Sequence, residues 1–321
     1  MTFPTRRAVL GGLAGSLAGS LAAPALVRAA PQTIRFAYQR SSTLLTILKT
    51  NGTLEQRLSP KGFGVSWHLF NSVIEPMNAG STDFHADVAD AVPIFTQAAG
   101  APLTFYAKED PSPSAEAIIV HADSPIRTVA DLRAKTVGFQ RGSGCHFILT
   151  AALKRAGLTP ADIRPAHLNA SDGAAAFERR SLDAWVIWDP FLAIAQAKSP
   201  VRVIADATGF SSYNRYYTVN TAFAEAHPEV VGVVFDALTE AGRWVKGNPK
   251  AAAEFLSPIW GDVPVGIVET VNARRSYAVK PVLREALGEQ QVIADTFHEA
   301  GLIPRRIDAT AVPLWHPETR G

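Results

Sequence analysis

Segments with strand patterns alternate with segments of helical periodicity, and this alternation limits the fold more than any other feature of the sequence. The first group of strand-like segments is residues 34–38, 64–70, 84–89 and 103–107. The helix-like segments between them are residues 43–58, 73–78 and 93–99. Such alternation is typical of α/β folds, so we expect a largely parallel sheet with helices on both faces.

The pattern then restarts, which indicates a second lobe. Its predicted strands are residues 117–121, 136–140, 184–188, 201–204 and 216–219, and its helices include residues 174–179 and 191–197. The remainder is mostly helical, at residues 228–246, 249–256, 265–272 and 289–300. We expect residues 31–117 with 220–321 to form lobe 1 and residues 118–219 to form lobe 2. In open α/β sheets ligands bind beyond the carboxyl ends of the strands.

The first thirty residues have the features of an export signal. Arg6 and Arg7 precede a weakly apolar run, and short residues around Ala29 suit a signal peptidase, so we predict a twin-arginine signal and a periplasmic protein. Residues 8–27 are just long enough for a membrane anchor, but their Gly, Ser and Pro make a poor spanning helix. No cysteine lies there, which excludes a lipoprotein anchor.

Charge and cysteine content exclude several classes of function. The net charge is 31 − 29 = +2, and removing residues 1–30 with their three arginines gives 28 − 29 = −1. A mature chain so balanced is not a dedicated nucleic-acid binder. Cys145 is the only cysteine, so no intrachain disulfide or multi-cysteine metal cluster is expected.

The strongest local signal is the segment Gln140-Arg141-Gly142-Ser143-Gly144-Cys145-His146, which follows a predicted strand and begins a helix. Glycines permit a tight turn there, and the first backbone amides of the helix would face an anion. The segment lacks the Gly-Lys-Ser/Thr of a phosphate loop and the third glycine of a dinucleotide site. The alternative is an ordinary turn with Ser143 as the helix cap.

Two other chemistries are weaker candidates. A thiol at a helix start has a lowered pKa, but no third group orients the pair Cys145-His146 for catalysis. His85, Asp87 and Asp90, with His146, would supply mixed metal ligands. The alternative is that Asp90 caps the next helix while the other two are solvated.

Two further strand ends carry residues suited to a ligand. Trp188 ends a predicted strand and would offer its ring to an apolar group, with a buried core role as the alternative. Gln39, Arg40 and Ser41 end the first strand and supply a cation and a hydroxyl.

The motifs that recur in a known family span most of the mature chain. They are residues 37–40, 93–101, 124–126 and 129–132, Val137-Gly138-Phe139-Gln140-Arg141-Gly142-Ser143 with His146, and Asp183-Ala184-Trp185-Val186-Ile187-Trp188-Asp189-Pro190. In these the chain resembles the aliphatic-sulfonate-binding proteins of ABC importers, within the sulfonate/nitrate/taurine-binding group. The resemblance implies a two-lobed, type II periplasmic-binding-protein fold that closes on a small anion at the hinge and delivers it to a membrane permease, without catalysis.

The chain departs from that family pattern at two places. Residues 85–89 are acidic and one residue longer than the short Gly/Ser/Thr-rich segment of the family, and Gly144-Cys145 stands where serines are common. A carboxylate near an anion is unfavourable unless it meets a cation. Asp87 therefore either selects a ligand that carries a cation or is neutralised by Arg40.

We therefore expect an exported, monomeric solute-binding protein for a small organic anion, most simply an aliphatic sulfonate, with an inner-membrane ABC permease as partner and with no cofactor, metal or nucleic acid. The alternatives are a taurine-like or other zwitterionic or nitrogenous ligand, a metal-dependent enzyme like the pyrimidine synthases, and a sensory domain. The expected ligand-binding residues are Gln39, Arg40, Ser41, Asp87, Asp90, Gln140, Gly142, Ser143, Gly144, Cys145, His146, Trp188 and Asp189. Residues 142–146 and 39–42 would hold the anion, and Trp188 would pack on its apolar part.

Overall fold

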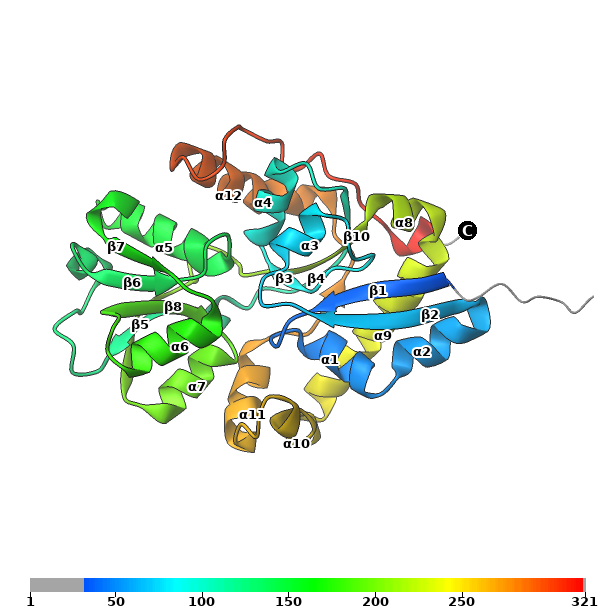
Figure 1. Cartoon of the computed structure of the whole chain (residues 1–321), viewed down its shortest axis with the longest axis horizontal. Helices are drawn as coiled ribbons and strands as arrows, with labels where there is room; N and C mark the ends of the chain where they lie inside the picture. Colours follow the sequence, from blue (N-terminus) through cyan, green and yellow to red (C-terminus); the bar gives the residue numbers. More distant parts are fainter. Residues whose placement is uncertain (1–31, 320–321) are drawn as a thin grey trace, which may run out of the picture. The chain divides into compact units, whose positions relative to one another are not determined.

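Two separate stretches of chain contribute the strands of a first sheet (Figure 1). The computed structural model describes residues 32–319. The strands of this sheet are β1 (Gln32–Tyr38), β2 (Phe63–Leu69), β3 (Val88–Ala89), β4 (Leu103–Glu109), β10 (Arg215–Asn220) and β11 (Val279–Lys280). β1 and β2 pair in parallel, whereas β10 pairs antiparallel with both β3 and β4. Phe84 connects the two groups through single bridges to Phe36 and Val219.

The second sheet is built from consecutive strands in the order β7-β6-β8-β5-β9. These are β5 (Glu116–His121), β6 (Thr136–Phe139), β7 (Arg164–His167), β8 (Ala184–Trp188) and β9 (Val201–Asp206). α5 (Gly144–Arg155) covers one face, and α6 (Ala170–Glu178) and α7 (Phe191–Lys198) cover the other (Figure 1).

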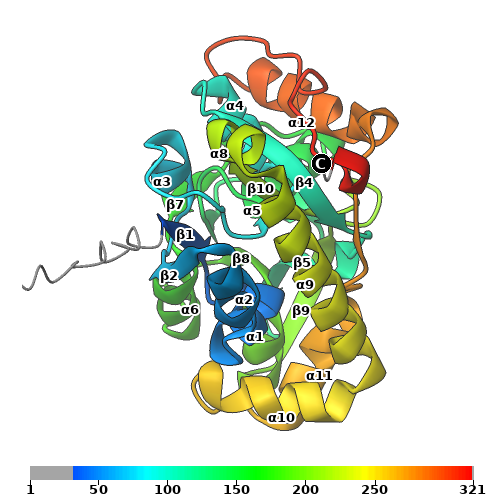
Figure 2. The same cartoon turned by 90° about the vertical axis from the view of Figure 1, so that its right-hand side faces the viewer.

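The remaining helices pack on the first sheet and on one another. They are α1 (Thr43–Thr50), α2 (Thr53–Leu58), α3 (Ile74–Asn78), α4 (Val92–Ala98), α8 (Thr221–Ala226), α9 (Pro228–Gly247), α10 (Pro249–Ile259), α11 (Val265–Arg274) and α12 (Gly288–Glu299). α9 runs beside α1 and α2 (Figure 2), and α12 packs on both α4 and α5.

The predicted α/β class is confirmed, but the sheets are mixed rather than largely parallel. β6 pairs in parallel with β7 and β8, whereas β5 pairs antiparallel with β8 and β9. A strand that runs parallel to its neighbour is reached through a crossover connection, usually a helix. β5 and β10 are each reached directly from the other sheet, without such a crossover, and both pair antiparallel with their neighbours. The two connecting segments lie side by side, since the Ser112 amide donates to the Ser212 carbonyl at 3.0 Å.

Three local predictions were wrong in detail. The strand at residues 216–219 was expected to close the second lobe, but it is part of β10 in the first sheet. The predicted helix 43–58 is divided into α1 and α2 because Gly52 adopts a left-handed conformation (φ +64°). The predicted strand 84–89 pairs only at Phe84 and at β3, so residues 85–87 form an irregular loop.

Candidate ligand-binding site

Residues from both sheets line two adjoining cavities. The inner cavity has an empty volume of about 420 Å³ and the outer one about 610 Å³. Four residues line both: Gln39 and Ser41 from the loop after β1, Gln140 from the turn after β6, and Trp188 at the end of β8. The inner cavity is also lined by Ser72, Val73, Ile74, Val88, Ala89, Val92, Glu116, Gly142, Ser143, Gly144, Tyr213 and Arg215. Arg40 lines the outer cavity only.

The turn between β6 and α5 presents the start of a helix to the inner cavity. Gly142 has a φ of +76°, which turns the chain back, and its amide donates to Nδ1 of His146 at 3.2 Å. Gly144 and Cys145 are the first residues of α5, so their N–H groups have no acceptor within the helix. The twelve-residue α5 adds the positive end of its dipole at this point. An anion in the inner cavity would face these groups.

Ser143 occupies the predicted capping position but does not cap α5. Its hydroxyl donates instead to the carbonyl oxygen of Gln140 at 2.7 Å. This bond closes the turn and leaves the first N–H groups of α5 without a side-chain acceptor. The alternative prediction, in which the Ser143 side chain caps α5, is therefore wrong.

His146 stabilises the turn through its hydrogen bond with the Gly142 amide and does not line either cavity. Its ring is buried against Phe95, Phe139 and Phe297. Burial lowers the pKa of His146 to about 4, and Nδ1 accepts the Gly142 amide, so the ring is neutral with its proton on Nε2.

This buried histidine predicts an acid-dependent loss of stability. Between pH 6.5 and 4 the unfolded chain binds a proton at His146 and the folded chain does not, so the stabilisation is complete above pH 6.5 and is lost as the pH falls. We expect the free energy of unfolding of the wild type, measured relative to that of His146→Gln, to fall by about 1.4 kcal/mol for each unit that the pH is lowered from 6.5 to 4. The total loss is roughly 3 kcal/mol. Urea unfolding of both proteins across this range checks it, and a constant difference would contradict the prediction.

Cys145 is buried beneath the same turn and lines neither cavity. Burial raises the pKa of the Cys145 thiol well above its usual value, and the neighbouring Glu116 adds to the effect. A thiol held in its protonated form is a poor nucleophile. This geometry gives no support to catalysis at Cys145.

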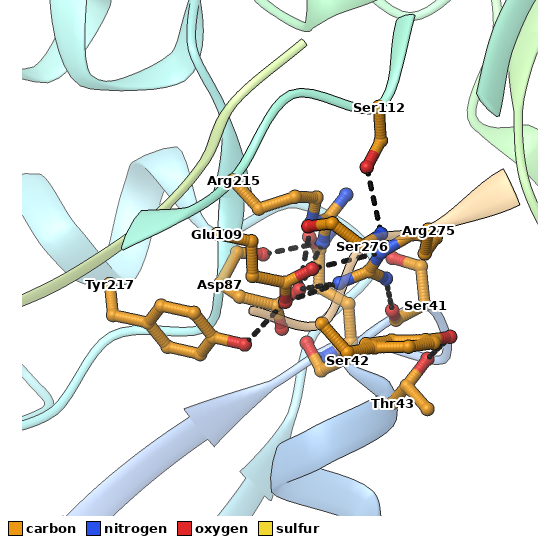
Figure 3. Close-up of polar contacts among 12 residues, drawn as sticks. Ser41, Ser42, Thr43, Asp87, Glu109, Ser112, Arg215, Tyr217, Arg275 and Ser276 are labelled. Atoms are coloured by element: carbon orange, nitrogen blue, oxygen red, sulfur yellow. Dashed lines mark hydrogen bonds and ion pairs between the residues drawn. The ribbon is translucent and has the colours of Figure 1, made fainter. Parts of the chain in front are cut away.

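Asp87 belongs to a buried cluster of two arginines and two carboxylates (Figure 3). Arg215 donates to Oδ2 of Asp87 through Nε at 2.8 Å and Nη2 at 2.5 Å. Arg275 donates to Glu109 at 2.6 Å and approaches Asp87 to 3.5 Å. The cation that neutralises Asp87 is therefore Arg215 and not Arg40, because β10 lies beside β3.

The same cluster fixes the loop that follows β1. Nη1 of Arg275 donates to the backbone carbonyl of Ser41 at 3.2 Å (Figure 3). The Gln39 amide donates to the Ser42 hydroxyl at 3.0 Å, which closes the loop at its base. These bonds hold Ser41 at the wall of both cavities.

Asp90 and Asp189 are buried but line neither cavity. Asp90 accepts from the Ser211 hydroxyl, and burial raises its pKa to about 7; it makes no capping bond to α4. Asp189 accepts from the Ala193 amide at 3.0 Å and from Arg274 at 3.1 Å, and burial raises its pKa to about 6. Both carboxyls are engaged with protein groups, so their predicted contact with a ligand has no geometric support.

The proposed metal ligands are not brought together. Nδ1 of His85 is 2.8 Å from the Thr218 hydroxyl, while Asp87 and Asp90 meet Arg215 and Ser211. Within residues 32–319 no group of three His, Cys, Asp or Glu side chains is placed to hold a metal ion.

In the same range, no helix is both long and apolar enough to cross a membrane.

Four polar residues of the inner cavity were not among the predicted site residues: Ser72, Glu116, Tyr213 and Arg215. Glu116 and Arg215 are the first residues of β5 and β10, whereas a ligand was expected at the residues that end the strands. Because β5 is antiparallel to β8, Glu116 pairs with Trp188 and lies at the ligand edge. A charged residue that begins an otherwise apolar strand was the available signal.

Comparison with known proteins shows the family of the chain. The family model described as NMT1/THI5 like matches residues 71–252. A putative aliphatic sulfonates-binding protein of Escherichia coli (strain K12) is 34% identical over 290 residues, 89% of this chain and 90% of the relative. The chain belongs to the aliphatic-sulfonate-binding proteins of the NMT1/THI5-like family.

Solved structures of this family share the fold. The periplasmic aliphatic sulphonate binding protein of Escherichia coli matches with a TM-score of 0.78 and 34% identity, over 89% of this chain and 98% of that one. The alkanesulfonate-binding protein of Xanthomonas axonopodis pv. citri bound to MOPS matches with a TM-score of 0.81 and 32% identity, over 87% and 96%. These family members are named as binding proteins and not as enzymes.

Proposed function

We propose that this chain is an exported solute-binding protein that captures an aliphatic sulfonate and presents it to an ABC permease. The observation that carries the proposal is that Gly144, the first residue of α5, lines a cavity that Ser41 and Gln140 also line. Backbone amides, a hydroxyl and a side-chain amide donate hydrogen bonds to an anion without a cation of their own. The names of the relatives and their bound ligand support the same substrate class.

Apolar side chains of the inner cavity suit an alkyl chain. Val73, Ile74 and Val92 line this cavity, and Trp188 lines both cavities. Burying each methylene of a ligand there is worth roughly 0.8 kcal/mol. The cavity therefore combines a polar end for a sulfonate with an apolar wall for its tail.

Ligand-dependent stabilisation tests the proposal. A ligand at ~100 times its dissociation constant adds about 2.7 kcal/mol to the free energy of unfolding. Purified protein is heated with ethane-, butane- and hexanesulfonate, with taurine, sulfate and nitrate as comparators, in buffers that contain no sulfonate. We expect stabilisation by the alkanesulfonates, increasing with chain length. A panel in which no sulfonate stabilises the protein would refute the function.

The two sheets would form the two lobes that close on the ligand, with residues 112 and 212 at their connections. The irregular segments between β4 and β5 and between β9 and β10 support this, since each joins one sheet to the other. Small-angle scattering with and without butanesulfonate would detect such closure.

The twin-arginine route is a separate proposal, because residues 1–30 lie outside the described residues. Periplasmic relatives support export, and Arg6 and Arg7 support this route. We expect Arg6→Lys with Arg7→Lys to leave unprocessed precursor in the cytoplasm, as measured by fractionation and immunoblotting. The single variant Arg28→Lys is the matched control and should be exported. Normal export of the double variant would exclude the twin-arginine route.

A further inference from the structure

Glu116 is the one carboxyl of the described chain that lines the inner cavity. It is fully buried at the start of β5, and neither of its oxygens has a nitrogen or oxygen hydrogen-bond partner. The neighbouring Cys145 thiol is only a weak donor, so the desolvation of this carboxyl is poorly compensated and its burial is costly. Such a group in a binding cavity indicates that the ligand supplies the missing partner.

The carboxyl lies against the first residue of α5. A Cβ atom added to Gly144 would come within 2.6 Å of Oε1 and 3.0 Å of Oε2. The carboxyl therefore shares the end of the cavity with the helix start that would receive the anion. An ionised carboxylate at that position would repel the ligand and occupy its donors.

Among residues 32–319, the charges around Glu116 leave no unpaired cation to compensate its ionised form. Arg215 faces it, but Arg215 and Arg275 are already balanced by Asp87 and Glu109. The other titratable groups that face Glu116 are Asp90, Cys145 and Tyr213. Burial raises the pKa of Glu116 well above its usual value, and Asp90 raises it further, while Cys145 and Arg215 act against the shift. The neutral acid is the form that the site favours.

We propose that Glu116 binds the sulfonate as a neutral carboxylic acid, donating a hydrogen bond to a sulfonate oxygen, so that the ligand is bound together with a proton. This inference rests on the proposed function and assigns a specificity-determining residue to its site. A sulfonate carries no proton near neutral pH, so its oxygens only accept hydrogen bonds. A protonated Glu116 completes a set of donors with Ser41, Gln140 and the start of α5.

The proposal predicts a pH-dependent affinity for butanesulfonate, measured by calorimetry between about pH 5 and pH 9. Once Glu116 ionises in the free protein, the dissociation constant should rise by up to about tenfold per pH unit. At the pH values where Glu116 is ionised in the free protein, calorimetric titrations with butanesulfonate in two sulfonate-free buffers of different ionisation enthalpy should show that the complex takes up nearly one proton per ligand bound. At neutral pH, where Asp90 is also partly protonated, the Glu116 component of the infrared carbonyl absorption should be lost in Glu116→Gln and kept in Asp90→Asn.

Three variants separate the role of Glu116 from a structural one. Glu116→Gln keeps a hydrogen-bond donor without titrating, so binding should persist within a few-fold and lose its pH dependence. Glu116→Leu removes the donor and should weaken binding by roughly tenfold to a hundredfold at all pH values. Asp90→Asn is the matched control, since Asp90 is buried and titrates but lines neither cavity; a pH dependence should remain, moved to lower pH because Asp90 no longer raises the pKa of Glu116.

Three results would overturn the inference while leaving the proposed function in place: an affinity for butanesulfonate that stays constant across the pH range in which infrared spectra show Glu116 ionising, loss of binding in Glu116→Gln, or tighter binding of taurine with release of a proton. The last would show that Glu116 is an ionised acceptor for an ammonium group. If no alkanesulfonate binds the wild type at any pH, the proposed function itself fails.

Discussion

Replacing Arg215 by methionine is expected to lower the free energy of unfolding by about 3–5 kcal/mol, because Asp87 loses the cation that is hydrogen-bonded to it in the interior and keeps only Arg275, which lies 3.5 Å away and already pairs with Glu109. The side chains of Arg215 and Asp87 are only 4% and 1% exposed, so water cannot replace the lost partner. Methionine fills much of the volume of the arginine side chain, so a cavity contributes little to the loss of unfolding free energy. Urea unfolding without ligand measures the effect.

Arg57→Met provides the matched control for Arg215→Met. Arg57 pairs with Glu240 on the surface, where the side chains are 35% and 57% exposed, and such a pair contributes about 0–1 kcal/mol. The double variant Asp87→Asn with Arg215→Met should recover part of the stability, because the pair is removed as a whole and the remaining buried charges of the cluster, Arg275 and Glu109, still pair with each other. A loss of less than about 1 kcal/mol in Arg215→Met would show that the pair is not a structural requirement.

The same pair tests the earlier hypothesis that Asp87 selects a cationic ligand. Since Asp87 is held by Arg215 and lines neither cavity, we expect Asp87→Asn to reduce stability and to change the affinities for butanesulfonate and taurine together. A selective loss of taurine binding would instead support a role in specificity.

Gly144→Val is expected to weaken sulfonate binding by more than about a hundredfold, because hydrogen bonds from the first N–H groups of α5 to a charged ligand are worth roughly 1.5–3 kcal/mol each. A Cβ at this position would meet Oε1 of Glu116 at 2.6 Å and the Ala89 Cβ at 3.0 Å, so the branched side chain would displace the carboxyl and fill the anion position. Calorimetry with butanesulfonate measures the loss.

Gly288→Val is the matched control for Gly144→Val. Gly288 is also the first residue of a helix, α12, and a Cβ there has no neighbour within 4 Å. This variant should bind like the wild type. Overpacking at Gly144 would also lower stability by about 1–3 kcal/mol, so circular dichroism must show that the variant is folded. Unchanged affinity in a folded Gly144→Val would place the anion elsewhere in the cavity.

The polar wall of the site was predictable where it depends on short stretches of sequence. Gln39, Ser41, Gln140 and Trp188 were predicted because each lies at or just after the end of a recognisable strand, and all four line both cavities. The turn at Gly142 was predictable because glycines between a strand and a helix mark a tight turn. Their contact with a ligand stays a prediction.

The sequence by itself determined the α/β class, most helix and strand positions and the helix start that faces the cavity, because these depend on local periodicity and turn chemistry. Only the tertiary structure decided that β10 returns to the first sheet and that Arg215, 128 positions from Asp87, is its partner. It also decided that Glu116 lies beside Trp188 at the ligand edge. Strand direction and the pairing of buried charges depend on which distant segments meet, and local patterns do not encode that choice.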